Sequence, residues 1–272
     1  MIRQSVFAGS WYPNDPVLLG RLIERAKEPK EGAFTRFAVL PHAGLSYSAP
    51  GIAPFFGSFD RSVTRLLVIG PSHYAHVPAD RIITAPFDSY ETPLGSLEGF
   101  SLSGANPAHA PILQREHSIE MVLPFIAGLE HPPKVSAALV NHFSSLKALD
   151  EMSDFLLEED EGLSIIASSD FTHYGPRFGF STLSEQEVKE RDIQVARLLA
   201  DGKIEEAFSF FTTSRHTICG WASAALVANI AKRKGMKGEV AGYYTSNDIA
   251  GRDDGDFVAY ATILWRQDGR VS

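Results

Sequence analysis

The feature that most constrains the fold is an alternation of short apolar runs with longer amphipathic stretches. The apolar runs are rich in β-branched residues and predict strands at Phe37–Leu40, Leu66–Ile69, Val135–Val140, Leu163–Ala167, Val240–Tyr244 and Phe257–Leu264. Helical patterns are found at Pro16–Lys27, Ile119–Leu129, Leu146–Leu157 and Glu185–Leu199. This order predicts an α/β fold with a largely parallel sheet and helices on both of its faces.

The last two predicted strands are expected to differ from the others in direction. They are joined through a charged turn at 252–256 that leaves no room for a helix, so we expect them to pair antiparallel. The sequence shows no internal repeat, low-complexity tract or linker. We therefore predict a single domain over residues 1–272.

Charge and cysteine content restrict the partners and the compartment. Lys and Arg number 25 against 33 Asp and Glu, and the net charge of −8 argues against a nucleic-acid-binding surface. The single cysteine excludes an intramolecular disulfide and fits a reducing compartment. No signal peptide or membrane-spanning run is visible. We predict a cytoplasmic protein that binds a small molecule or peptide, and its oligomeric state stays open.

Histidines gather just beyond the predicted strands. His42, His73, His142 and His173 each follow a strand-like run within a few residues. Because ligands bind outside the carboxyl ends of parallel strands, these side chains are expected to share one cleft. A single histidine in such a place is usually a surface residue, whereas four in register indicate a metal-binding or catalytic site. His142 has no partner motif, so a supporting role and a functional role are both open.

Further candidate groups surround these histidines. Asp170 and His173 lie three residues apart and are able to bind a metal jointly or to share a proton. Cys219 precedes a predicted helix, whose N-terminus favours a thiolate, although most free cysteines are small buried apolar residues. His117 and Glu120 share a helix face and are candidates for lining the cleft or for capping the helix. Three other histidines are predicted to lie on the surface, namely His76, His109 and His131.

An ordered set of motifs resembles the Memo-like family, also called AmmeMemoRadiSam system protein B. The matching stretches are Ala8–Pro13, Pro41–Gly44, Gly70–His73, Glu116–Glu120, Ser168–His173, Cys219–Gly220 and Tyr243–Ser246. They cover nearly the whole chain, and Tyr74 stands where the family often has a second histidine. The family is similar in fold to the class III extradiol (LigB-type) dioxygenases. The resemblance implies an αβα sandwich and a metal site of His42, His73 and Cys219, with Asp170 and His173 beside it.

The implied ligand set leaves several functions open. Non-haem iron dioxygenases use two histidines and a carboxylate, whereas a thiolate favours copper(I), iron or zinc over magnesium or calcium. The first hypothesis is a redox enzyme that uses Fe(II) or copper, with Asp170 and His173 as an acid/base pair or as extra ligands. The second is a non-enzymatic protein that binds a metal or a peptide in the same cleft. A third, metal-assisted hydrolysis, lacks a dedicated general base.

Overall fold

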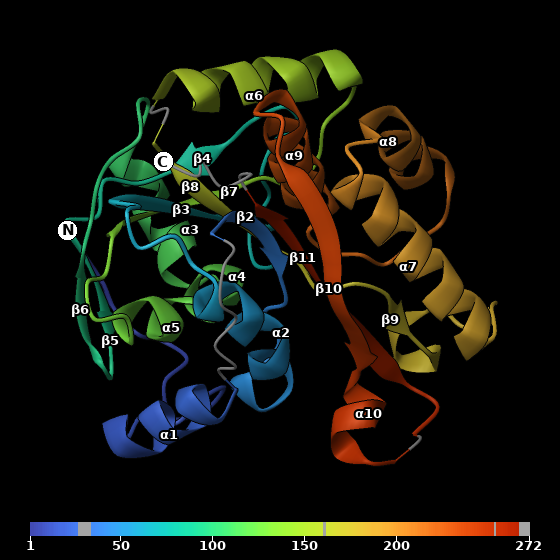
Figure 1. Cartoon of the computed structure of the whole chain (residues 1–272), viewed down its shortest axis with the longest axis horizontal. Helices are drawn as coiled ribbons and strands as arrows, with labels where there is room; N and C mark the ends of the chain where they lie inside the picture. Colours follow the sequence, from blue (N-terminus) through green and yellow to red (C-terminus); the bar gives the residue numbers. More distant parts are fainter. Residues whose placement is uncertain (27–33, 160–161, 253, 267–272) are drawn as a thin grey trace.

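The computed structural model describes residues 1–26, 34–159, 162–252 and 254–266 (Figure 1). Two residues of the predicted pattern lie outside these ranges. Lys27 was expected to end the first helix, and Asp253 belongs to the charged turn near the C-terminus. Within the described residues, every helix is too short or too polar to cross a bilayer.

An eight-stranded sheet forms the centre of the molecule (Figure 1). Its main path runs in the order β10-β11-β2-β8-β3-β7-β4, and β9 pairs with β11 beside this path. The strands are β2 Thr35–Leu40, β3 Arg65–Gly70, β4 Ile83–Thr84, β7 Lys134–Leu139, β8 Ser164–Ser168, β9 His173–Tyr174, β10 Lys237–Thr245 and β11 Phe257–Arg266. All six predicted strands are confirmed.

The strand directions differ from the predicted largely parallel sheet. The neighbours β2, β8, β3 and β7 are parallel, while β4, β9, β10 and β11 pair antiparallel, so the sheet is mixed. Antiparallel pairing of the last two predicted strands is confirmed. Their connection does contain a helix, α10 Ser246–Ala250, because a single turn with a Thr245–Asp248 capping box fits where a crossover helix would not.

Side chains of the central strands alternate between two cores. Phe37 and Val39 of β2 belong to one core, and Ala38 and Leu40 belong to the other. The first core is covered by α6 Leu146–Glu159, α7 Glu185–Ala200, α8 Ile204–Thr213 and α9 Trp221–Arg233. The second is covered by α1 Pro16–Ala26, α2 Leu45–Gly57, α3 Ala110–Gln114, α4 His117–Glu120 and α5 Leu123–Ala127. Helices on both faces of the sheet are therefore confirmed (Figure 1).

Proline explains two differences from the predicted helices. The pattern at Ile119–Leu129 folds as two short helices, α4 and α5, because Pro124 has no N–H to donate to the carbonyl of Glu120. The sequence pattern did not reveal α2, which contains Pro50 and Pro54. The remaining elements are β1 Ile2–Arg3, β5 Ser89–Thr92 and β6 Gly95–Glu98, which form a small sheet, and the 3₁₀ turns Pro107–His109 and Pro176–Phe178.

Candidate metal centre

Three histidines from separate segments meet beyond the carboxyl ends of the parallel strands. His42 follows β2, His73 follows β3, and His117 opens α4. One ligand atom of each lies within 4.8 Å of those of the other two. The ring centres of His73 and His117 are 4.2 Å apart, and that of His42 lies 5.2 and 5.3 Å from them. The structure thus brings His42 and His73 together, and it adds His117 to them.

Each of the three imidazoles is held through its Nδ1 atom. The Nδ1 of His42 is 2.9 Å from the Ser168 hydroxyl, and that of His117 is 3.0 Å from the Tyr74 hydroxyl. The Nδ1 of His73 lies 2.8 Å from the Glu116 carboxylate. Partners of this kind fix the ring orientation of metal-binding histidines and leave Nε2 for the metal.

Glu116 is a functional candidate that the sequence reasoning did not single out. Its carboxylate is fully buried and also accepts a 2.7 Å hydrogen bond from the backbone N–H of His73. Burial alone would raise the pKa of Glu116, but the hydrogen bonds from His73 hold this pKa below its usual value. Glu116 also caps α4 by accepting from the N–H of Ser118, which is the capping role expected for this polar cluster. Its place beside His117 in the Glu116–Glu120 motif was the available signal.

Two glycines allow the backbone segments of the site to approach closely. A Cβ atom on Gly70 would lie 2.4 Å from the hydroxyl of Ser118, so glycine lets α4 pack against the end of β3. The Ser118 hydroxyl donates to the Pro71 carbonyl across this contact. A Cβ atom on Gly220 would lie 2.4 Å from the Ser168 carbonyl, so glycine also brings the start of α9 against β8.

Cys219 contacts one member of the histidine cluster, His42, but lies outside the group of three whose ligand atoms are all within 4.8 Å of one another. Its Sγ atom lies 3.3 Å from the Nε2 of His42 and 3.6 Å from the Asp170 carbonyl. Burial, followed by the negative charge of Asp170, raises the pKa of the Cys219 thiol. The thiolate that the helix N-terminus predicted is therefore disfavoured without a metal, because desolvation outweighs the helix dipole.

Asp170 follows the end of β8 and His173 opens β9, and both line the pocket beside the cluster. The buried Asp170 carboxylate accepts a 2.7 Å hydrogen bond from the backbone N–H of His42. Burial raises the pKa of Asp170, and the neighbouring His173 partly opposes this shift. The Nδ1 of His173 lies 3.1 and 3.0 Å from the carbonyls of Phe171 and Thr217. Since a carbonyl only accepts, Nδ1 of His173 carries a proton, and in the neutral ring Nε2 is the acceptor.

A pocket of about 420 Å³ opens over this cluster. Asp170 and the imidazoles of His42, His73, His117 and His173 line it. Its other side chains are mainly aromatic or small, and they include Ser10, Trp11, Ser46, Tyr47, Phe178 and Val258. Titratable groups and an apolar wall thus share one concave site, which is typical of binding and catalytic pockets.

Two predicted groups lie away from this pocket. Glu120 is fully buried and binds Arg3, with 2.8 Å between its Oε2 and Nη1 of the arginine, so only His117 of the predicted pair lines the pocket. His142 is exposed, and its ring packs 5.3 Å from that of Trp221. The preceding Asn141 supports the site instead, because its side-chain amide exchanges two hydrogen bonds with the backbone of Ser72.

The histidines predicted to lie on the surface do so with one exception. His76 and His131 are exposed. His109 is half-buried, and its Nδ1 lies 3.2 Å from the Thr84 carbonyl.

The fold and the site define a mixed α/β protein with a histidine cluster at its strand ends. The Memo-like protein family matches residues 3–264, so the chain belongs to the Memo-like family. A MEMO1 family protein of Thermococcus onnurineus is 28% identical and covers 98% of this chain and 100% of its own. The MEMO1 family protein of Archaeoglobus fulgidus is 27% identical, and the match covers 97% of this chain and 100% of the relative. A MEMO1 family protein of Schizosaccharomyces pombe is 30% identical, and the match covers 66% of this chain and 63% of the relative.

Proposed function

We propose that the protein binds a transition metal through His42, His73 and His117, with Cys219 as the fourth ligand. The observation that carries this proposal is the set of three imidazoles, each held through Nδ1, whose ligand atoms lie within 4.8 Å of one another. Bonds of about 2 Å to nitrogen require ligand atoms about 3–4 Å apart, which small side-chain movements would provide. His42 and Cys219 are already at such a distance.

The donor set indicates which metals would bind. Imidazole and thiolate favour iron, copper or zinc, whereas magnesium and calcium prefer oxygen ligands. We infer Fe(II) or copper, since a redox metal would give the adjoining pocket a use beyond structural support. Such a metal would supply redox or Lewis-acid chemistry to a molecule in the pocket. The proposed relation to the LigB-type dioxygenases rests on the motifs and on the mixed α/β fold.

Asp170 and His173 are assigned to proton transfer in this proposal. Both line the pocket, and in the neutral ring of His173 the Nε2 atom is the acceptor nitrogen. The Asp170 carboxylate holds the backbone of His42, so it also positions a ligand of the metal. An enzyme of this kind would use His173 to take a proton from the bound molecule.

Metal analysis of purified variants tests the site. We expect the full chain, prepared without oxygen or chelator, to contain stoichiometric metal that His73→Ala removes and Cys219→Ser reduces. His142→Ala is the matched control, because this exposed histidine also follows a strand but lies outside the cluster. Unchanged metal content in His73→Ala would show that the proposed ligands are wrong.

Oxygen uptake separates the enzyme from a binding protein. The Fe(II)-loaded chain is mixed with catechols or thiols, and oxygen consumption is recorded. A redox enzyme would consume oxygen, and His173→Gln would slow it without removing the metal. Metal binding with no turnover of any such compound would favour the alternative of a non-enzymatic metal- or peptide-binding protein.

A further inference from the structure

A single buried carboxylate holds the N-terminal segment against the site. Glu120 is fully buried and accepts four hydrogen bonds from residues that precede α1. The donors are the Arg3 guanidinium at 2.8 Å, the backbone N–H groups of Val6 and Phe7 at 3.1 and 2.8 Å, and the Tyr12 hydroxyl at 2.7 Å. Residues 3–12 therefore form a segment that is clamped at both ends and in the middle.

This clamp places Trp11 on the wall of the pocket. The Trp11 backbone accepts from the N–H of Leu45 and donates to the carbonyl of Phe7, both at 2.9 Å. Its ring centre lies 4.5 Å from that of His117 and 5.4 Å from that of Phe7. The indole is half-buried and lines the pocket, so it presents a planar surface that is held in place from behind.

Two further aromatic side chains line the same pocket as Trp11. Tyr47 and Phe178 are both half-buried and line the pocket, and the Phe178 ring lies 5.3 Å from that of His173. Among the described residues that line the pocket, none is a lysine or an arginine. The guanidinium of Arg177 lies 5.7 Å from the Phe178 ring but does not line the pocket.

We propose that Trp11, Tyr47 and Phe178 form an aromatic subsite that binds an uncharged planar ring of the ligand by stacking. Rings stack favourably on such surfaces. An anionic group in the subsite would lose its hydration without gaining a lysine or arginine partner. Glu120 acts as a positioning residue, because its hydrogen bonds to residues 3–12 hold Trp11 at the wall. The subsite goes beyond the proposed metal site and does not depend on a bound metal.

Fluorine NMR with para-fluorophenol and para-fluorobenzoate tests the subsite. The full chain is titrated twice, once with chelator and once loaded with Fe(II) without oxygen. Trp11→Ala should weaken para-fluorophenol binding about five-fold in both states, within the range of stacked aromatic pairs. Trp11→Phe should retain most of the affinity. Phe34→Ala, which removes an exposed aromatic side chain outside the pocket, should change nothing.

Two results would overturn the subsite. One is unchanged para-fluorophenol affinity in Trp11→Ala, and the other is equally tight binding of para-fluorobenzoate to the metal-free chain. If the wild-type chain takes up no metal and Trp11→Ala still lowers the affinity for para-fluorophenol, the subsite is supported and the proposed metal site is refuted. Normal metal content together with unchanged probe affinity in Trp11→Ala would refute the subsite alone.

Tyr12→Phe tests the clamp without leaving a charge unpaired. It removes one of the four hydrogen bonds to Glu120, and we expect it to weaken para-fluorophenol binding about two-fold. Metal content should not change. A merely structural role would lower stability and leave the affinity for para-fluorophenol unaltered, and that result would overturn the positioning role of Glu120.

Discussion

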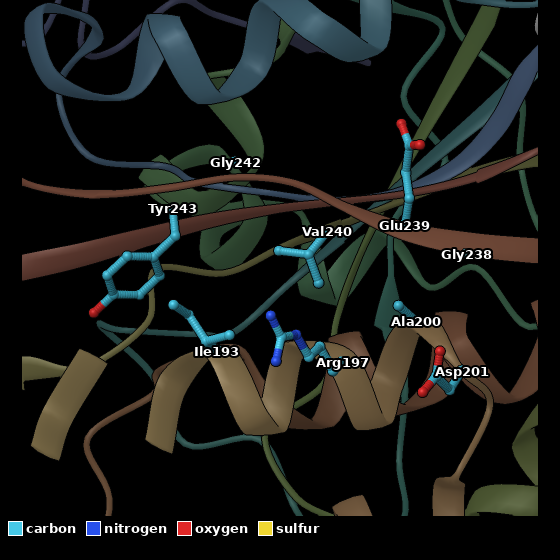
Figure 2. A pocket seen from close by; sticks show the side chains of 9 residues that line it. All are labelled: Ile193, Arg197, Ala200, Asp201, Gly238, Glu239, Val240, Gly242 and Tyr243. Carbon is cyan, nitrogen blue, oxygen red and sulfur yellow. The ribbon is translucent and has the colours of Figure 1, made fainter. Parts of the chain in front are cut away.

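The pocket over the histidines can be compared with a groove of about 320 Å³ between α7 and β10 (Figure 2). The two hollows are similar in volume, but their charged groups differ. In the groove, Arg197 extends from α7 toward Val240, and the carboxylates of Asp201 and Glu239 pair with Lys203 and Arg266 near the surface. In the pocket, Asp170 and the imidazoles of His42 and His117 are buried and lie close together.

The two hollows hold different groups because different parts of the chain form their walls. The groove is lined by α7, the adjoining Asp201 and the edge strand β10. The pocket receives residues from the ends of β2, β3 and β8 and from α4, so separate parts of the chain converge on one point. Convergence of this kind assembles a donor set that a single helix and strand do not provide.

The largest expected effect concerns the buried ion pair behind the pocket. Arg3→Ala leaves the Glu120 carboxylate buried without its cation and should lower the free energy of unfolding by about 3–5 kcal/mol. Lys203→Ala, which removes the exposed partner of Asp201 beside the groove, should cost less than about 1 kcal/mol. Urea denaturation of both variants measures the contrast, and equal losses would contradict it.

The buried Asp192 should make stability depend on pH. It accepts hydrogen bonds from Thr172, next to the site, and from Tyr243, in the groove. Burial raises the pKa of Asp192 to about 6, although these hydrogen bonds oppose the shift. Between about pH 4 and pH 6 the folded chain therefore binds more protons than the unfolded chain, so stability falls as pH rises.

An asparagine at this position removes the titration. From pH 4 to pH 7, wild type should lose up to about 3 kcal/mol of unfolding free energy relative to Asp192→Asn. Urea denaturation of the two proteins at each pH measures this difference. A difference that stays constant with pH would show that Asp192 does not titrate in this range.

A change at Glu116 should affect metal affinity more than the stability of the whole fold. Glu116→Gln weakens the acceptor of the His73 ring N–H, so metal affinity should fall about 10- to 100-fold. Glu239→Gln changes a carboxylate of the groove in the same way and should leave the affinity unaltered. Competition with a chelator of known affinity measures both variants. If the two behaved alike, the role assigned to Glu116 would be refuted.

The smallest effect is expected in the groove itself. Arg197 is exposed and forms no ion pair with another described residue, so Arg197→Ala should change the free energy of unfolding by less than about 0.5 kcal/mol. Metal content should also stay the same. A marked loss of either quantity would show that the groove contributes more than its surface charges indicate.

Much of the fold could be predicted because its signals are local. Apolar runs marked all six predicted strands, and the short final connection indicated the antiparallel pair. Helix boundaries were less accessible where prolines interrupt the pattern, as in α2 and between α4 and α5. The full sheet order involves contacts between distant segments, and no local pattern reports that β8 lies between β2 and β3.

The site divides in the same way. Histidines placed just after strands could be recognised in the sequence, because local residues mark the end of a strand. The carboxyl ends of parallel strands lie at one edge of the sheet, so these histidines were expected to share one cleft. Only the packed molecule decided that His117 turns toward His73 while Glu120 turns toward Arg3. The choice depends on how closely α4 approaches β3 at Gly70, and such an approach arises from packing between segments distant in sequence.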